Sequence, residues 1–107
     1  MEYQEYVSLL EAFRLSLTAA ENNPNVVQIV DQINETIAHL KTGKYHAVAL
    51  TQEVFEVIDL VNKNMAFKGL KLNAYQSKAW NRLKEKSYQS YSQDRNALGF
   101  SGAFGVN

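Results

Sequence analysis

The sequence predicts an all-α protein that folds as one bundle of four helices with a flexible C-terminal tail. Its 107 residues suit a single domain, residues 1–107, with one core. Hydrophobic residues make up 46% of the chain and charged residues 21%, as is typical of a folded globular protein. Apolar residues also recur every three or four positions in four segments, which is the spacing of a helical face. These segments predict helices at about 3–21, 25–41, 47–66 and 74–91, and a tail at 93–107.

A break of turn residues separates the first two helices. The apolar residues of segments 3–21 and 25–41 each fall on one helical face. Between them stands Asn22-Asn23-Pro24-Asn25, where proline cannot continue a helix and asparagine favours turns and caps. The second helix is therefore expected to begin near Pro24 or Asn25. Gly43 occupies the position expected just past its C-terminus.

The third segment admits two interpretations. Its β-branched residues (Val54, Val57, Ile58 and Val61) leave room for a strand. The length of the segment and its period of about 3.6 residues favour a helix instead. Its start is open between Tyr45 and Thr51.

The fourth helix opens with a capping box. Asn73 is followed three residues later by Gln76, a pair in which each side chain satisfies a backbone amide of the other. The helix is thus expected to start at Ala74 and to fray in the polar segment 84–92. Its apolar stripe comprises Tyr75, Ala79 and Leu83, flanked by Trp80.

Ten apolar positions are predicted to form the core, whereas the role of the C-terminal tail has several alternatives. The ten are Leu10, Phe13, Leu17, Ile29, Ile33, Ile37, Val54, Ile58, Val61 and Leu83. The tail from Ala97 onward carries three of the five glycines, which disfavour helix. Its Phe100 and Phe104 have three alternatives, namely docking on the bundle, disorder, or contact with a partner.

Composition narrows the setting in which the protein works. The chain has no cysteine, which excludes disulfides and thiolate sites. Its N-terminus is acidic and polar, unlike a secretory signal. No apolar run approaches the roughly 18 residues that cross a bilayer. We expect a cytoplasmic protein, with attachment to a membrane surface left open.

Charge is divided between the two parts of the chain although the formal net charge is zero. Residues 1–62 carry nine acidic and three basic side chains, whereas residues 63–107 carry eight basic and two acidic ones. Two interpretations stand side by side. The two parts attract each other across the bundle, or the basic part keeps a surface for a partner.

No residue pattern predicts catalysis. His39 and His46 lack the His-Glu-x-x-His spacing of a zinc helix, and we expect both to be solvent-exposed or near helix caps. Glu53, Glu56 and Asp59 recur every three residues, as on the solvated face of an amphipathic helix. No glycine-rich phosphate loop is present. We therefore expect no enzyme activity, no cofactor and no metal.

The start of the fourth helix resembles a known family. The sequence Gly69-Leu70-Lys71-Leu72-Asn73-Ala74-Tyr75-Gln76-Ser77-Lys78, followed by Leu83-Lys84, resembles the immunity proteins of pediocin-like (class IIa) bacteriocins. The resemblance implies an antiparallel four-helix bundle in the cytoplasm of a bacteriocin-producing bacterium. Such a protein shields the bacteriocin receptor, a mannose-phosphotransferase membrane component, once bacteriocin has engaged it. The family's C-terminal half, here residues 73–107, determines which bacteriocin is resisted.

The partner-binding surface is accordingly expected in the basic, aromatic C-terminal part. Its candidate residues are Lys78, Trp80, Arg82, Tyr88, Tyr91, Arg95, Phe100 and Phe104. Interleaved basic and aromatic residues also occur in single-strand nucleic-acid binders, although the sequence pI of about 6.7 disfavours that role. The alternative function is a small regulatory or phage-type bundle that binds nucleic acid or an enzyme through the same part. A core position for Trp80 is a further alternative.

Overall fold

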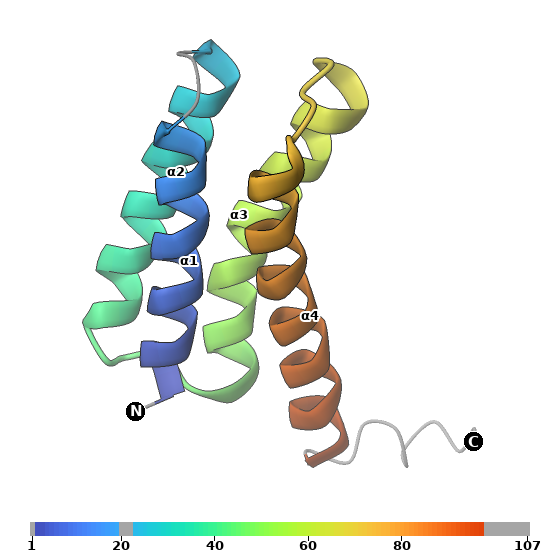
Figure 1. The fold of residues 1–107 in the computed structure, drawn as a ribbon. Helices are drawn as coiled ribbons and strands as arrows, with labels where there is room; N and C mark the ends of the chain where they lie inside the picture. The colour runs from blue at the N-terminus through green and yellow to red at the C-terminus, as the bar shows by residue number, and fades with distance from the viewer. Residues whose placement is uncertain (1, 20–22, 98–107) are drawn as a thin grey trace.

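The predicted all-α fold is confirmed. The computed structural model describes residues 2–19 and 23–97, and within them it contains four helices and no strand. The helices are α1 (Glu2–Thr18), α2 (Pro24–Lys41), α3 (Ala47–Phe67) and α4 (Ala74–Ala97). Successive helices run in opposite directions, and each packs against its neighbours in the chain while α4 closes on α1 (Figure 1). This arrangement is an antiparallel four-helix bundle.

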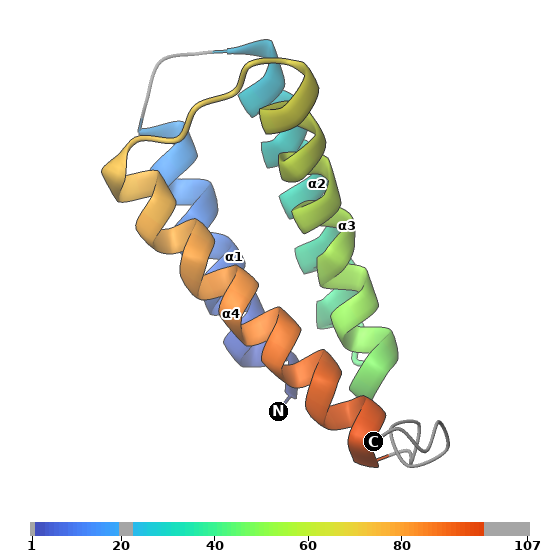
Figure 2. The ribbon, with the colours of Figure 1, turned by 90° about the vertical axis from the view of Figure 1, so that its right-hand side faces the viewer.

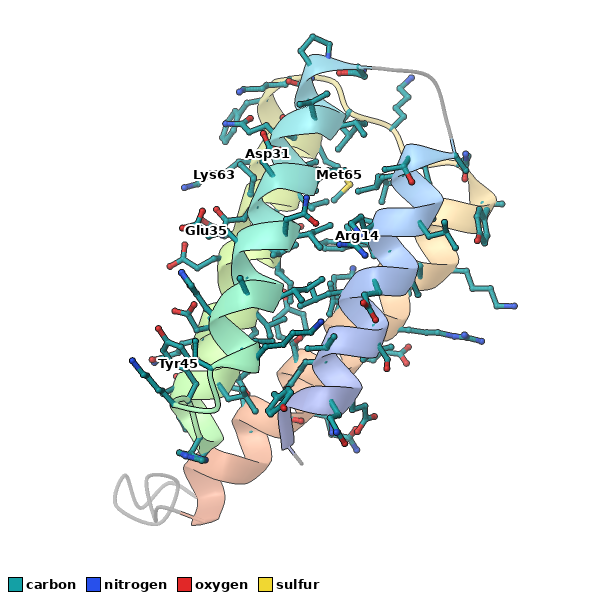
Figure 3. The ribbon with its side chains drawn as sticks, turned by 90° about the vertical axis from the view of Figure 1, so that its left-hand side faces the viewer. Arg14, Asp31, Glu35, Tyr45, Lys63 and Met65 are labelled. Atoms are coloured by element: carbon teal, nitrogen blue, oxygen red, sulfur yellow. The ribbon has the colours of Figure 1, made fainter. Side chains whose placement is uncertain are left out.

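The bundle consists of two helix pairs that diverge toward one end. Helix α1 lies beside α4, and α2 lies beside α3 (Figure 2). The pairs approach each other where α1 and α3 begin and separate toward the other end, where the segment 68–73 crosses from α3 to α4. Leu70 of this segment is buried, and Leu72 and Met65 pack against the core from its edge. Figure 3 shows Met65 between the two pairs near the wide end. Apolar side chains of the connection thus close the wide end of the core.

All ten predicted core residues are buried, and the core is larger than predicted. It also contains Tyr6, Val7, Leu40, Leu50, Val57, Leu70 and Trp80. A buried hydrogen bond joins α1 to α3 within this core, between the Tyr6 hydroxyl and the Thr51 hydroxyl at 3.2 Å. The apolar stripes of α1, α2 and α3 therefore meet in a single core, as their spacing predicted.

The predicted stripe of α4 is confirmed at Leu83, which is buried, and at Ala79, which packs against the core from its edge, but it is wrong at Tyr75. Tyr75 is 57% exposed, whereas Trp80 is 3% exposed and belongs to the core. The inward face of α4 follows Gln76, Trp80, Leu83 and Ser87, so two of its four members are polar. Ser87 is satisfied inside its own helix, because its hydroxyl donates to the Leu83 carbonyl at 2.8 Å. Because half of the inward face is polar, the apolar periodicity of the sequence does not mark this face.

The ends of α2 and α3 follow the expected local chemistry. The Asn23 side chain caps α2 by accepting a hydrogen bond from the Asn25 amide at 2.8 Å. Gly43 follows the helix with a φ of 73°. Helix α3 begins at Ala47, within the range left open by the sequence. It ends at Phe67, and the φ of 71° at Gly69 turns the chain so that the Lys68 and Leu70 amides both donate to the Asn64 carbonyl, at 3.0 and 3.1 Å.

The predicted capping box of α4 is confirmed in both directions. The Asn73 amide donates to Gln76 Oε1 at 2.9 Å, and the Gln76 amide donates to Asn73 Oδ1 at 2.8 Å. The Gln76 side chain also reaches α1, because its Nε2 donates to the Ser16 carbonyl at 3.4 Å. One residue thus caps α4 and joins it to α1.

Two predicted boundaries need correction. Helix α4 does not fray at residue 91 but continues to Ala97, so the predicted tail is wrong for residues 93–97. The reason is tertiary, since Tyr88 and Tyr91 pack on Phe55 of α3 and hold this polar part of the helix in place. Helix α1 ends at Thr18, before the predicted residue 21. The prediction for residues 98–107 lies outside the described residues.

Candidate protein-binding surface

Trp80 is a core residue and not a surface anchor, which corrects its place among the candidate residues. Its ring centroid lies 5.5 Å from that of Phe13 on α1, and the ring planes are tilted by 33°. Lys84 Nζ covers the ring from outside, 5.3 Å from its centroid. Because Trp80 stands one turn after the capping residue Gln76, it faces α1 in the same way. A partner does not reach it without unfolding α4.

The basic residues of the C-terminal part divide between two roles. Lys86 joins α4 to α1, since its Nζ lies 3.1 Å from Glu5 Oε1 and 5.7 Å from the centroid of the Tyr6 ring. Lys63 pairs with Asp59 on its own helix at 3.0 Å. Lys78 and Arg82, by contrast, are exposed and form no ion pair with the described residues. Attraction across the bundle thus applies to Lys86, whereas a partner surface at Lys78 and Arg82 stays a prediction.

Tyr88 and Tyr91 form an aromatic cluster with Phe55 where α4 crosses α3. The ring centroid of Phe55 lies 5.7 Å from that of Tyr88 and 5.4 Å from that of Tyr91. Tyr88 remains 52% exposed, so one side of its ring is accessible. This contact brings together residues 33 positions or more apart in the sequence.

A groove opens beside this cluster, with a volume of about 400 Å³. Its lining consists of Gln52, Phe55, Glu56, Ile58, Asp59, Asn62 and Tyr88. Phe55, Ile58 and Tyr88 supply an apolar surface, and the exposed carboxylates of Glu56 and Asp59 stand next to it. Such a lining suits an apolar side chain that is followed by a lysine or arginine on a partner. We refer to this feature as the α3–α4 groove.

The sequence pattern indicated Tyr88 as a site residue but did not indicate the α3 wall of the groove. Glu56 and Asp59 were predicted to lie on a solvated face, and they do, but that face is also one side of the groove. The signal was available in part, because the polar and aromatic lining residues of α3 recur with helical spacing. The sequence did not show that Tyr88 would pack against this face.

The two histidines lie at helix contacts and helix ends. His39 Nδ1 lies 2.8 Å from Glu53 Oε1, which joins α2 to α3, and its Nε2 lies 3.9 Å from Glu35. Its side chain is 44% exposed, in line with the expectation, whereas the contact with Glu53 was not foreseen. His46 is exposed and precedes α3 as its N-cap residue, as expected. No group of three acidic or histidine side chains within residues 2–19 and 23–97 is arranged to hold a metal ion.

Three candidate residues remain without a structural account. Arg95 lies on α4, but its side chain is outside the description, and Phe100 and Phe104 lie outside the described residues altogether. The structure therefore brings together two of the eight candidates, Tyr88 and Tyr91, through Phe55. It places Lys78 and Arg82 on the outer surface of α4 and Trp80 in the core.

Comparison with known proteins gives no match to any family model, curated protein or solved structure. Within the described part of the chain, no helix combines the length and apolarity needed to cross a bilayer. The fold and the α3–α4 groove are the features of this chain that bear on its function. They describe an antiparallel helical bundle with an accessible aromatic surface beside carboxylates.

Proposed function

We propose that this chain is a binding protein without catalytic activity, of the bacteriocin-immunity type. In this proposal it protects the producing cell from the cytoplasmic side by binding the bacteriocin-engaged receptor, a mannose-phosphotransferase membrane component. The observation that carries the proposal is the α3–α4 groove, where the accessible ring of Tyr88 lies beside two carboxylates. The resemblance of residues 69–84 to the immunity proteins of pediocin-like bacteriocins gives the proposal its particular partner.

The chemistry of the groove fits the cytoplasmic side of a membrane protein. Cytoplasmic loops of membrane proteins are enriched in lysine and arginine near the ends of their spanning segments. The carboxylates of Glu56 and Asp59 complement such loops, and Tyr88 offers an aromatic anchor of the kind that dominates binding energy. Asp59 already holds Lys63 at 3.0 Å, which leaves Glu56 as the carboxylate without an ion pair in the described residues. Glu56 and Tyr88 are therefore the two residues to test.

The test measures survival of a bacteriocin-sensitive strain that expresses the chain or its variants. Tyr88→Ala should reduce protection strongly, because an aromatic anchor at a binding surface is worth about 2 kcal/mol or more. Glu56→Lys should also reduce it strongly, because it reverses the charge that complements a basic loop. Each has a matched control. Gln89→Ala changes an exposed neighbour of Tyr88 that does not line the groove, and Asp31→Lys reverses an exposed acid on α2.

Both controls should protect like the original chain, and all four variants should keep their helical circular dichroism. Full protection by the Tyr88→Ala, Glu56→Lys double variant would remove the groove as the binding site. No protection by the original chain against any pediocin-like bacteriocin would refute the immunity function itself.

A further inference from the structure

Exposed apolar side chains gather at one end of the bundle. Among the described residues, five large hydrophobic side chains are exposed, and one of them, Tyr88, belongs to the α3–α4 groove. The other four are Leu15 (61% exposed), Val27 (51%), Phe67 (83%) and Tyr75 (57%). They come from four different helices and share no stretch of sequence. Their common feature is therefore a place in the fold.

That place is the wide end of the bundle. Leu15 and Phe67 stand in the last turns of α1 and α3, and Val27 and Tyr75 stand in the first turns of α2 and α4. All four helix ends lie at the same side of the molecule, opposite the N-terminus (Figure 1). We call this region, residues 12–19, 23–30 and 64–82, the crossover end.

The crossover end is also basic. Its sequence contains Arg14, Lys68, Lys71, Lys78 and Arg82 and no aspartate or glutamate. Glu21, in the connection between α1 and α2, lies outside the described residues. Arg14, labelled in Figure 3, donates to Asn34 Oδ1 at 2.7 Å and lies 3.9 Å from the Glu11 carboxylate. The other four are exposed and form no ion pair with the described residues. Glu11 and Asp31 stand just outside these ranges, one turn from Leu15 and Val27. The unpaired positive charge therefore gathers around Phe67 and Tyr75.

We infer that the crossover end docks on an anionic lipid bilayer. Phe67 and Tyr75 then enter the interface between headgroups and acyl chains, where aromatic residues are favoured. The lysines and arginine remain at the level of the phosphates, with their aliphatic stems against the acyl boundary. A bilayer rewards both features of this end at once, because it offers negative charge and an apolar layer within a few ångströms of each other.

Other occupants match the crossover end less well. Nucleic acid would use the basic residues and Tyr75, but it offers nothing to the aliphatic Leu15 and Val27, which make no stacking platform. A second copy of the chain docked end to end would place four unpaired cations against four others. A bilayer is the occupant that uses the charge and all four apolar side chains. The inference does not rest on the proposed function, since a bilayer alone, without any receptor, is enough to test it.

The experiment is co-sedimentation of the purified full chain with vesicles. Vesicles of phosphatidylcholine with a quarter of phosphatidylglycerol should retain the protein, and pure phosphatidylcholine vesicles should retain much less. Raising the salt concentration should weaken the binding, because the attraction to the anionic surface is screened. Equal retention by both vesicle types, or none by either, would overturn the inference.

Variants test the residues and separate lipid from nucleic acid. Phe67→Ala should weaken partitioning by about tenfold or more, as expected for loss of one large inserted side chain. Lys71→Gln should weaken it by about fivefold, as expected for one cation near an anionic surface. Tyr88→Ala, the matched aromatic control in the groove, should bind vesicles like the original chain. Phe67 is 83% exposed, so its removal leaves the fold intact, and thermal melting verifies this.

Unchanged partitioning of Phe67→Ala would overturn the inference, as would a larger loss for Tyr88→Ala. Binding to a single-stranded oligonucleotide in the absence of vesicle binding would assign the crossover end to nucleic acid instead. Vesicle binding without any protection in the survival assay would uphold this inference while refuting the proposed function.

Discussion

Replacing Gln76 tests how much the junction of α4 with α1 contributes to the free energy of unfolding. Its side chain is 5% exposed and makes two hydrogen bonds, accepting from the Asn73 amide at 2.9 Å and donating to the Ser16 carbonyl at 3.4 Å. Ser16 belongs to the last turn of α1, where an α-helix leaves its carbonyls without partners of its own. Gln76→Ala therefore removes half of a capping box and one hydrogen bond between α4 and α1.

The expected cost follows from these two bonds. Loss of a capping interaction costs about 1 kcal/mol. Loss of the second hydrogen bond leaves a carbonyl without its partner and adds about 1–3 kcal/mol. Gln76→Ala should therefore lower the free energy of unfolding by about 2–4 kcal/mol. At about 4–8 °C per kcal/mol for a domain of this size, the melting temperature should fall by roughly 8–32 °C.

A second variant separates the two contributions. Gln76→Glu keeps an oxygen that accepts from the Asn73 amide, but it has no amide to donate to the Ser16 carbonyl. It also places a carboxylate beside that carbonyl oxygen. Gln76→Glu should therefore lose the hydrogen bond to Ser16 while retaining the capping box. Its loss of stability then reports the junction with α1 and not the cap.

Urea unfolding is the assay, followed by circular dichroism and by fluorescence of Trp80, the single tryptophan of the chain. Trp80 lies one turn after Gln76 in the core and reports on the same contact with α1. Gln89→Ala, an exposed change later in α4, is the control. If Gln76→Ala unfolded within 0.5 kcal/mol of this control, roughly the range of neutral surface changes, the reasoning about the inward face of α4 would be refuted.

Three further predictions concern the corrected parts of the fold. Trp80→Ala should cost about 3–5 kcal/mol in chemical unfolding, whereas Tyr75→Ala should stay within about 0.5 kcal/mol, and the reverse order would restore the stripe that the sequence suggested. Gly69→Ala should cost about 1–2 kcal/mol in thermal unfolding through backbone strain alone, because its φ is 71° and no atom lies within 4 Å of an added Cβ, so an unchanged melting temperature would argue against this helix stop. Phe55→Ala should speed amide hydrogen exchange in residues 86–97 relative to residues 76–83, since the support for the end of α4 is lost. Equal exchange of residues 86–97 in the variant and in the original chain would contradict that explanation.

The sequence by itself determined the features that depend on neighbouring residues. Capping is set within four residues, so Asn23, Gly43 and the Asn73–Gln76 pair marked their helix ends correctly. The apolar stripes of α1, α2 and α3 determined which face each helix would bury, because one helical face carries nearly all of the large apolar side chains there. The core and the number of helices followed from these local patterns.

Only the tertiary structure decided the features in which two distant segments meet. The inward face of α4 carries Gln76 and Ser87, polar residues that the sequence alone would place on the solvent side. This face turns inward because Gln76 bonds to the Ser16 carbonyl and Trp80 packs on Phe13. The last turns of α4 are polar and lack an apolar stripe, so their extension to Ala97 depends on Phe55 beneath the tyrosines. The α3–α4 groove and the crossover end likewise join side chains from separate helices. No local pattern contains such contacts, because the energy that forms them comes from surfaces that meet only when the chain has folded.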